Sequence, residues 1–185
     1  MSEYQYYEFC QIGKPLSQEA RKTMSSLSSR VQITTHGAAY VYNYGSFGGD
    51  PKKLLLKYFD VFFYISNWGD FQLMFKYPAH QVDIEGLKKY GIKDVISCKK
   101  RGQNVLLEIQ ICNEDGWGWT EGEGVLPNLL PLYEEIKAKN YQLLRLVSTV
   151  NDIFMGEEQK PLSKIIAKRK LSSAQKAFLN TVGID

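Results

Sequence analysis

The chain of 185 residues carries few side chains suited to catalysis. Its two histidines, His36 and His80, fall on different expected elements, and neither has a recognised spacing to a cysteine or carboxylate. A cysteine nucleophile would therefore need a histidine brought near by folding. The glycine-rich run before Asp50 and Pro51 lacks the Lys-Ser/Thr ending of a phosphate-binding loop. We expect no enzyme activity, no catalytic residue and no cofactor.

Tyrosines recur with strand spacing in two segments, where they could stack on planar ligands. Residues 4–9 read Tyr-Gln-Tyr-Tyr-Glu-Phe, and residues 40–44 read Tyr-Val-Tyr-Asn-Tyr. Because side chains alternate across a strand, alternate residues of each run should share a face. The two faces together predict one surface, formed by Tyr4, Tyr6, Glu8, Tyr40, Tyr42 and Tyr44. RNA-recognition domains stack bases on aromatic side chains of such strands. The alternative is that C-terminal helices cover this surface and make the tyrosines core residues.

Residues 113–126 are acidic and rich in glycine, which is typical of a loop. Carboxylates in such a loop could bind Ca²⁺ or Mg²⁺, but the spacing matches no EF-hand, so no metal site is predicted. Trp117 and Trp119 would point the same way in an extended segment, and exposed they would form a binding hot spot. The acidic residues are Glu114, Asp115, Glu121 and Glu123.

A basic helix is expected near the C-terminus. Lys160, Lys164 and Lys168 recur every four residues and place charge on one face of the helix. This face could contact phosphate, acidic lipid or an acidic partner. An ordinary solvated face is the favoured alternative.

Composition indicates an ordinary globular protein, with 44% hydrophobic and 23% charged residues. The net charge of +3 is unevenly placed, since residues 1–156 hold seventeen basic and seventeen acidic groups. No apolar stretch is long enough for a membrane span, and no signal peptide is recognisable. The odd number of cysteines (Cys10, Cys98 and Cys112) suits reduced, buried thiols. A disulfide between Cys98 and Cys112, facing each other across a hairpin, is the less favoured alternative. We expect a cytoplasmic protein.

The periodicity of the first eighty residues predicts a β-α-β-β-α-β order. Strands are expected at 4–12, 30–36, 39–44 and 71–77, and helices at 17–27 and 54–65. Asp50 is the expected N-cap before the second helix, and Pro51 takes the first helical position. This is the ferredoxin-like order, in which a four-stranded antiparallel sheet carries two helices on one face. The predicted fold is therefore α+β with a ferredoxin-like core.

Further elements are expected after this core. A short helix at 83–90 precedes two strands, 94–100 and 104–112. A turn at Arg101-Gly102-Gln103 joins them into an added β-hairpin. Helices follow at 129–138, 140–155, 162–170 and 172–181 and form a C-terminal helical layer. The predicted organisation is a sheet domain at 1–112, a loop at 113–126, and helices at 127–185 packed on the same body.

Several short segments of the chain together form a recognisable set. They are residues 4–9, Leu27-Ser28-Ser29-Arg30, Gly49-Asp50-Pro51, Tyr58-Phe59-Asp60 and Asn67-Trp68-Gly69. These segments resemble a group of uncharacterised bacterial proteins. The likeness covers most of the chain and implies a bacterial, cytosolic protein, but it carries no known activity.

The function expected from these observations is a non-enzymatic protein-interaction module, either an adaptor or an accessory subunit. Binding of single-stranded RNA or DNA through an aromatic sheet face is the alternative. Neither a membrane nor a small molecule is an expected partner. The candidate binding residues are Tyr4, Tyr6, Tyr40, Tyr42, Tyr44, Trp117, Trp119, Lys160, Lys164 and Lys168.

Overall fold

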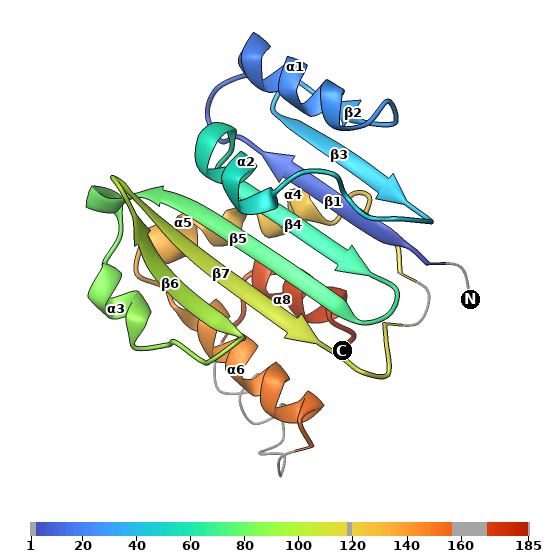
Figure 1. The fold of residues 1–185 in the computed structure, drawn as a ribbon. Coiled ribbons are helices and arrows are strands. Elements are labelled where there is room, and N and C mark those ends of the chain that lie inside the picture. The colour runs from blue at the N-terminus through green and yellow to red at the C-terminus, as the bar shows by residue number, and fades with distance from the viewer. Residues whose placement is uncertain (1–2, 118–119, 157–169, 185) are drawn as a thin grey trace.

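The computed structural model describes residues 3–117, 120–156 and 170–184. These residues form a mixed α+β structure around one open antiparallel sheet of seven strands (Figure 1). The strand order across the sheet is β2-β3-β1-β4-β5-β7-β6. The α+β class predicted from the sequence is confirmed.

The strands range in length from two residues in β2, at one edge of the sheet, to nine in β5 and β7. Their bounds are β1 (Gln5–Cys10), β2 (Gln32–Ile33), β3 (Gly37–Tyr42), β4 (Val61–Ser66), β5 (Asp70–Pro78), β6 (Ile96–Arg101) and β7 (Asn104–Cys112). The described helices are α1 (Gln18–Leu27), α2 (Pro51–Tyr58), η1 (Ala79–Gln81, a 3₁₀ turn), α3 (Ile84–Lys88), α4 (Leu126–Leu129), α5 (Pro131–Lys137), α6 (Gln142–Phe154) and α8 (Ser173–Thr181). None of these helices has both the length and the apolar character to span a membrane.

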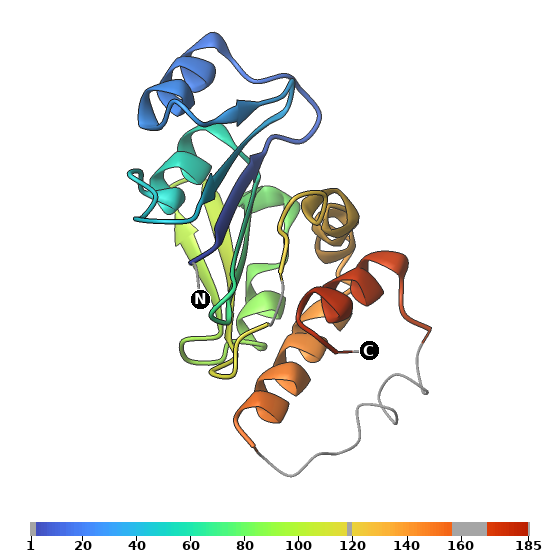
Figure 2. The ribbon, with the colours of Figure 1, turned by 90° about the vertical axis from the view of Figure 1, so that its right-hand side faces the viewer.

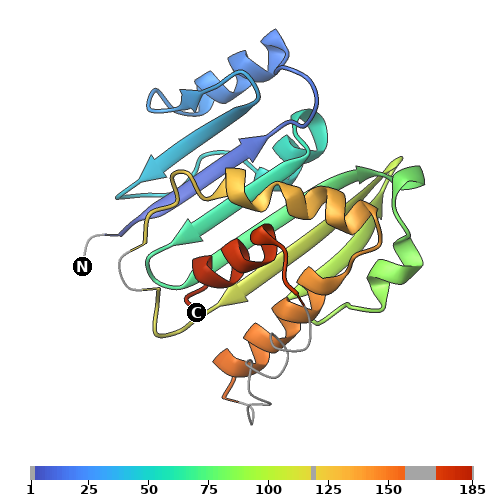
Figure 3. The ribbon, with the colours of Figure 1, turned by 180° about the vertical axis from the view of Figure 1, so that it is seen from behind.

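The sheet separates two hydrophobic cores. Helices α1 and α2 lie on one face, and α4, α5, α6 and α8 lie on the other (Figures 2 and 3). Met24 and Leu55 belong to the first core, and Leu132 and Phe178 belong to the second. The C-terminal helices therefore share a core with the sheet.

The start of α2 was predicted from local rules. The Asp50 side chain accepts a hydrogen bond from the Lys53 backbone N–H at 3.1 Å, and Pro51 occupies the first turn. Asp is favoured as the N-cap because its carboxylate accepts a hydrogen bond from a free backbone N–H of the first turn. Pro is favoured at the first helical position because it has no N–H to leave unpaired there.

The predicted helix at 54–65 is wrong beyond Tyr58. The helix ends there, and Val61–Ser66 form β4. Five of the six β4 side chains are buried, because helices cover both faces of the sheet around this strand. A strand buried on both faces reads as an unbroken apolar run and is easily mistaken for a helix.

The missed strand changes the sheet. β4 pairs with β1 and with β5, so the segment expected as the fourth strand, 71–77, does not lie next to β1. The predicted second strand at 30–36 is reduced to the two residues of β2. The added hairpin is confirmed as β6 and β7, paired from Ile96 to Arg101.

Candidate functional site

The tyrosines expected on one surface lie on opposite faces of the sheet. In the register of β1 and β3, Tyr7 is paired with Tyr40 and Tyr6 with Val41. Directly paired residues share a face. Tyr40 and Tyr42 therefore lie on the face that α1 and α2 cover, while Tyr4 and Tyr6 lie on the other. The predicted single surface of tyrosines is wrong.

A segment of the loop before α4 covers the Tyr6 side. The Tyr6 side chain is only 4% exposed. Gly122 lies so close that a Cβ there would collide with the Tyr6 ring. The Gly122 backbone N–H also donates to the Tyr4 hydroxyl at 2.9 Å. We call residues 120–125 the strap. It is the strap, together with α4, that covers β1 on this side (Figure 3).

Glu8 lies under the strap beside Tyr6. The Tyr6 hydroxyl donates to Glu8 Oε2 at 3.0 Å. Burial raises the pKa of Glu8, the Tyr6 hydrogen bond lowers it in part, and the charge of Glu123 raises it further. Because desolvation is the largest of these effects, the charged form of Glu8 destabilises the folded state.

This raised pKa predicts a pH-dependent effect of Glu8→Gln on stability. The folded state binds the proton more tightly than the unfolded state, so stability from this group is present at low pH and lost as pH rises through the raised pKa. Glu8→Gln should therefore gain stability relative to wild type as pH rises from 4 toward neutrality, roughly the range in which carboxyls titrate. Urea unfolding at several pH values measures this difference. A difference for Glu8→Gln that is constant with pH would contradict the prediction.

On the opposite face, Tyr40 is a core residue. Its side chain is 1% exposed, and its hydroxyl donates to the Met24 carbonyl at 2.7 Å. Tyr42 is half-buried at the rim, with its ring edge-on to Tyr7 at 5.9 Å. Tyr44, past the end of β3, is 80% exposed.

Exposed aromatic side chains gather at one end of the sheet. Trp68, in the turn between β4 and β5, is 41% exposed, and its Nε1–H donates to Asp70 Oδ2 at 2.8 Å. We call Tyr42, Tyr44 and Trp68 the aromatic end. Gln5 of β1 connects the two turns that carry them, because it is paired with both Tyr42 and Ser66. The Gln5 side chain also donates to the Gly45 carbonyl at 2.7 Å.

Hydrogen bonds fix the turn that carries Trp68. The Tyr4 backbone N–H donates to Asn67 Oδ1 at 3.0 Å, and the Asn67 N–H donates to the Tyr4 carbonyl at 3.1 Å. Gly69 has a φ of 108°. Its carbonyl accepts a hydrogen bond from the Asn113 backbone N–H at 2.9 Å. The Asn-Trp-Gly sequence thus joins two neighbouring segments and leaves the tryptophan at the surface.

The remaining predicted site residues divide into two groups. Trp117 is half-buried: its Nε1–H donates to the Asp70 carbonyl at 3.3 Å, and its ring lies edge-on to Phe154 at 5.6 Å. These contacts attach the loop to the body of the protein. Four further residues lie outside the described parts of the chain, namely Trp119, Lys160, Lys164 and Lys168.

The groups considered for catalysis are dispersed. His36 Nδ1 lies 2.9 Å from the Lys14 carbonyl. Burial raises the pKa of Cys10 to about 11, so its thiol is protonated at neutral pH. Within the described parts of the chain, no group of three or more His, Cys, Asp or Glu side chains could hold a metal ion.

The cysteines are free thiols, and one of them differs from expectation. Cys10 and Cys98 are half-buried, whereas Cys112 is exposed and not buried as expected. Across the hairpin Cys98 is paired with Leu107 and not with Cys112. The alternative of a disulfide between Cys98 and Cys112 is therefore wrong.

Trp68 was missed as a candidate binding residue. A tryptophan between asparagine and glycine, in a turn between two apolar runs, has few neighbours to bury it, and this signal could have identified it. Comparisons with protein-family models, with curated proteins and with solved structures give no match for this chain.

Proposed function

We propose that the protein is a non-enzymatic interaction module, an adaptor or accessory subunit of a bacterial cytosolic complex, and that a partner protein binds its aromatic end. The observation that carries the proposal is the exposure of Trp68 and Tyr44 on turns held by hydrogen bonds. Tryptophan and tyrosine dominate the binding energy of many protein interfaces. They also lose little conformational entropy on binding, because each has only two side-chain torsions.

Charge around the aromatic end favours a neutral or basic partner surface. Asp70 accepts the Trp68 hydrogen bond. Glu114 and Asp115 are exposed on the loop whose Gly116 lies against the Trp68 backbone. Acidic groups at the rim of an interface steer basic partners toward it and repel phosphate. This charge, and the burial of Tyr6 and Tyr40 on opposite faces, favour a protein partner over single-stranded nucleic acid.

Site-specific crosslinking in the native host tests the proposal. A photoreactive phenylalanine analogue replaces Tyr44 in the full chain, and the same analogue replaces Lys22, an exposed residue of α1. We expect a discrete crosslinked protein from position 44 that Trp68→Ala reduces about thirtyfold, because losing a hot-spot residue costs roughly 2 kcal/mol. The same products from position 22, or products that Trp68→Ala leaves unchanged, would overturn the proposal.

We also infer that the first part of the chain is a ferredoxin-like core to which β5, β6 and β7 are added. In support, β1, α1, β2, β3, α2 and β4 follow that fold's order of elements, and these four strands are neighbours in the order β2-β3-β1-β4. Both helices contribute to one core on one face. In this interpretation β4, and not the segment 71–77, is the fourth strand of the core.

A further inference from the structure

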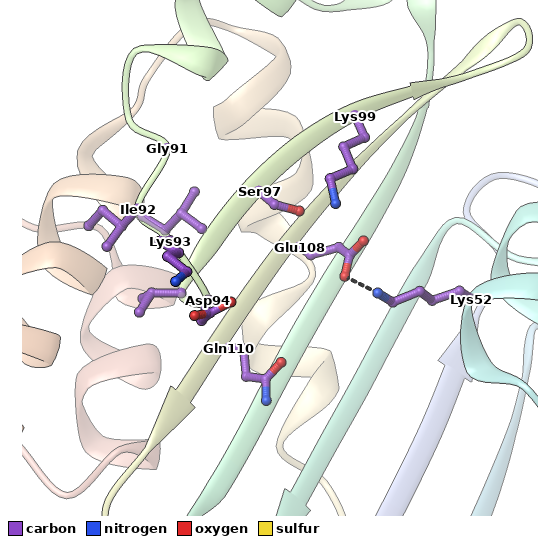
Figure 4. A pocket seen from close by; sticks show the side chains of 11 residues that line it. Lys52, Gly91, Ile92, Lys93, Asp94, Ser97, Lys99, Glu108 and Gln110 are labelled. Carbon is purple, nitrogen blue, oxygen red and sulfur yellow. Dashed lines mark ion pairs between the residues drawn. The ribbon is translucent and has the colours of Figure 1, made fainter.

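The face of the sheet that carries α1 and α2 is covered only in part. Beyond α2, β6 and β7 form the floor of a cavity of about 430 Å³. Lys52 of α2 lies on one side of the cavity, and the loop from Gly91 to Val95 lies on the other (Figure 4). This volume lies within the usual range of small-molecule sites, roughly 300 to 1,000 Å³. The cavity lies on different strands from the aromatic end.

Charged groups from separate elements converge on this cavity. Three lysines line it together with two carboxylates: Lys52, Lys93, Lys99, Asp94 and Glu108. Lys52 Nζ and Glu108 Oε2 are 2.6 Å apart, and the Glu108 side chain is 12% exposed. Figure 4 shows the side chains of Lys52 and Lys99 both directed toward Glu108.

The lining combines anion-binding and hydroxyl-binding groups. Lys52 and Glu108 neutralise each other as an ion pair, so the other charged groups of the lining, Lys93, Lys99 and Asp94, give the cavity a net charge of +1. Ammonium groups donate to phosphate oxygens. Carboxylates accept hydrogen bonds from hydroxyl groups and repel polyanions. The amide of Gln110 and the hydroxyl of Ser97 can each donate and accept hydrogen bonds.

We propose that this cavity binds a phosphorylated polyhydroxy compound of the size of a sugar phosphate. Lys99 donates to the phosphate, and Asp94 and Gln110, which Figure 4 shows farther along the cavity, accept the hydroxyl groups. A bare anion would satisfy only the lysines, and a neutral sugar would satisfy only the carboxylates and amide. A ligand with both features uses the whole lining.

Lys99 and Lys100 provide a matched pair of variants. Lys99 is paired with Leu106, whose side chain belongs to the core under α1 and α2, so Lys99 points to the cavity side. Lys100 is paired with Val105 and lies on the opposite face. Both lysines are exposed and carry the same charge. Lys99→Gln and Lys100→Gln thus remove one charge each, one residue apart, on different faces.

An NMR titration of the ¹⁵N-labelled full chain tests the proposal, with glucose 6-phosphate, glucose and inorganic phosphate as separate probes at constant ionic strength. We expect glucose 6-phosphate to shift the backbone amides of residues 91–97 and 108–110 saturably at millimolar concentration, and more tightly than the other two probes. Lys99→Gln should weaken this binding about tenfold, the usual cost of one charge-assisted hydrogen bond, and Lys100→Gln should leave it unchanged. Equal losses in both variants, equal affinity for inorganic phosphate, or no shift of these amides would overturn the proposal.

Discussion

Gly69→Ala should lower the free energy of unfolding by about 3 kcal/mol, because it combines backbone strain with a steric collision. The φ of 108° at Gly69 is a conformation that residues with a Cβ rarely adopt. The added Cβ would also collide with the backbone carbonyl of Asn113, which cannot turn aside as a side chain could. The two turns that carry Trp68 and Asn113 would have to separate. Urea unfolding followed by circular dichroism measures the loss.

Gly102→Ala is the matched control. Gly102 has a φ of 60°, but no atom lies within 4 Å of the position of its Cβ. It should therefore show only the conformational cost, about 1 kcal/mol. If Gly69→Ala cost no more than this control, the contact between the two turns would contribute nothing to stability. A larger loss should also reduce crosslinking from position 44, since Trp68 would no longer be held in place.

Local sequence rules predicted the features that depend on neighbouring residues alone. Asp50 and Pro51 identified the start of α2, because capping depends on atoms within one helical turn. The glycine of the turn at Arg101-Gly102-Gln103 identified the β6–β7 hairpin, since Gly102 adopts a positive φ. In both cases the signal lies within four residues of the feature.

The boundary between α2 and β4 could not be predicted in this way. Residues 54–65 are apolar throughout, and the change from helix to strand depends on what covers them. Asp60 lies at the boundary between α2 and β4. Its carboxylate accepts a hydrogen bond from the Ile12 backbone N–H at 2.8 Å and lies 3.5 Å from Lys76 Nζ. Both partners are distant in sequence, so the role of Asp60 is a tertiary one.

The candidate sites could be predicted only in part, because they too depend on contacts between segments distant in sequence. Tyr44 was proposed from its strand spacing and is exposed, but the face occupied by each tyrosine depends on the β1–β3 register. A shift of one residue in that register would exchange the faces, and no local signal fixes it. The cavity beside β6 was not predicted, because Lys52, Lys99 and Glu108 have no common spacing and meet only across the sheet.

Tyr6→Ala should lower the free energy of unfolding by about 3 kcal/mol, since it removes a buried ring and leaves a cavity beneath the strap. The ring is 4% exposed and lies 6.2 Å, centroid to centroid, from that of Phe63. Tyr44→Ala, at the exposed end of the other tyrosine run, should change stability by less than about 0.5 kcal/mol. The same denaturation experiment compares the two variants.

The contrast between these two tyrosines tests the division of the aromatic residues into core and surface. We expect Tyr6→Ala to lose stability. Tyr44→Ala should instead weaken binding to the partner that crosslinking identifies, while remaining as stable as wild type. Small effects on stability from both variants would mean that the strap does not cover Tyr6 in solution. Its ring would then be available for stacking, and binding of single-stranded nucleic acid on that face of the sheet would become the better-supported function.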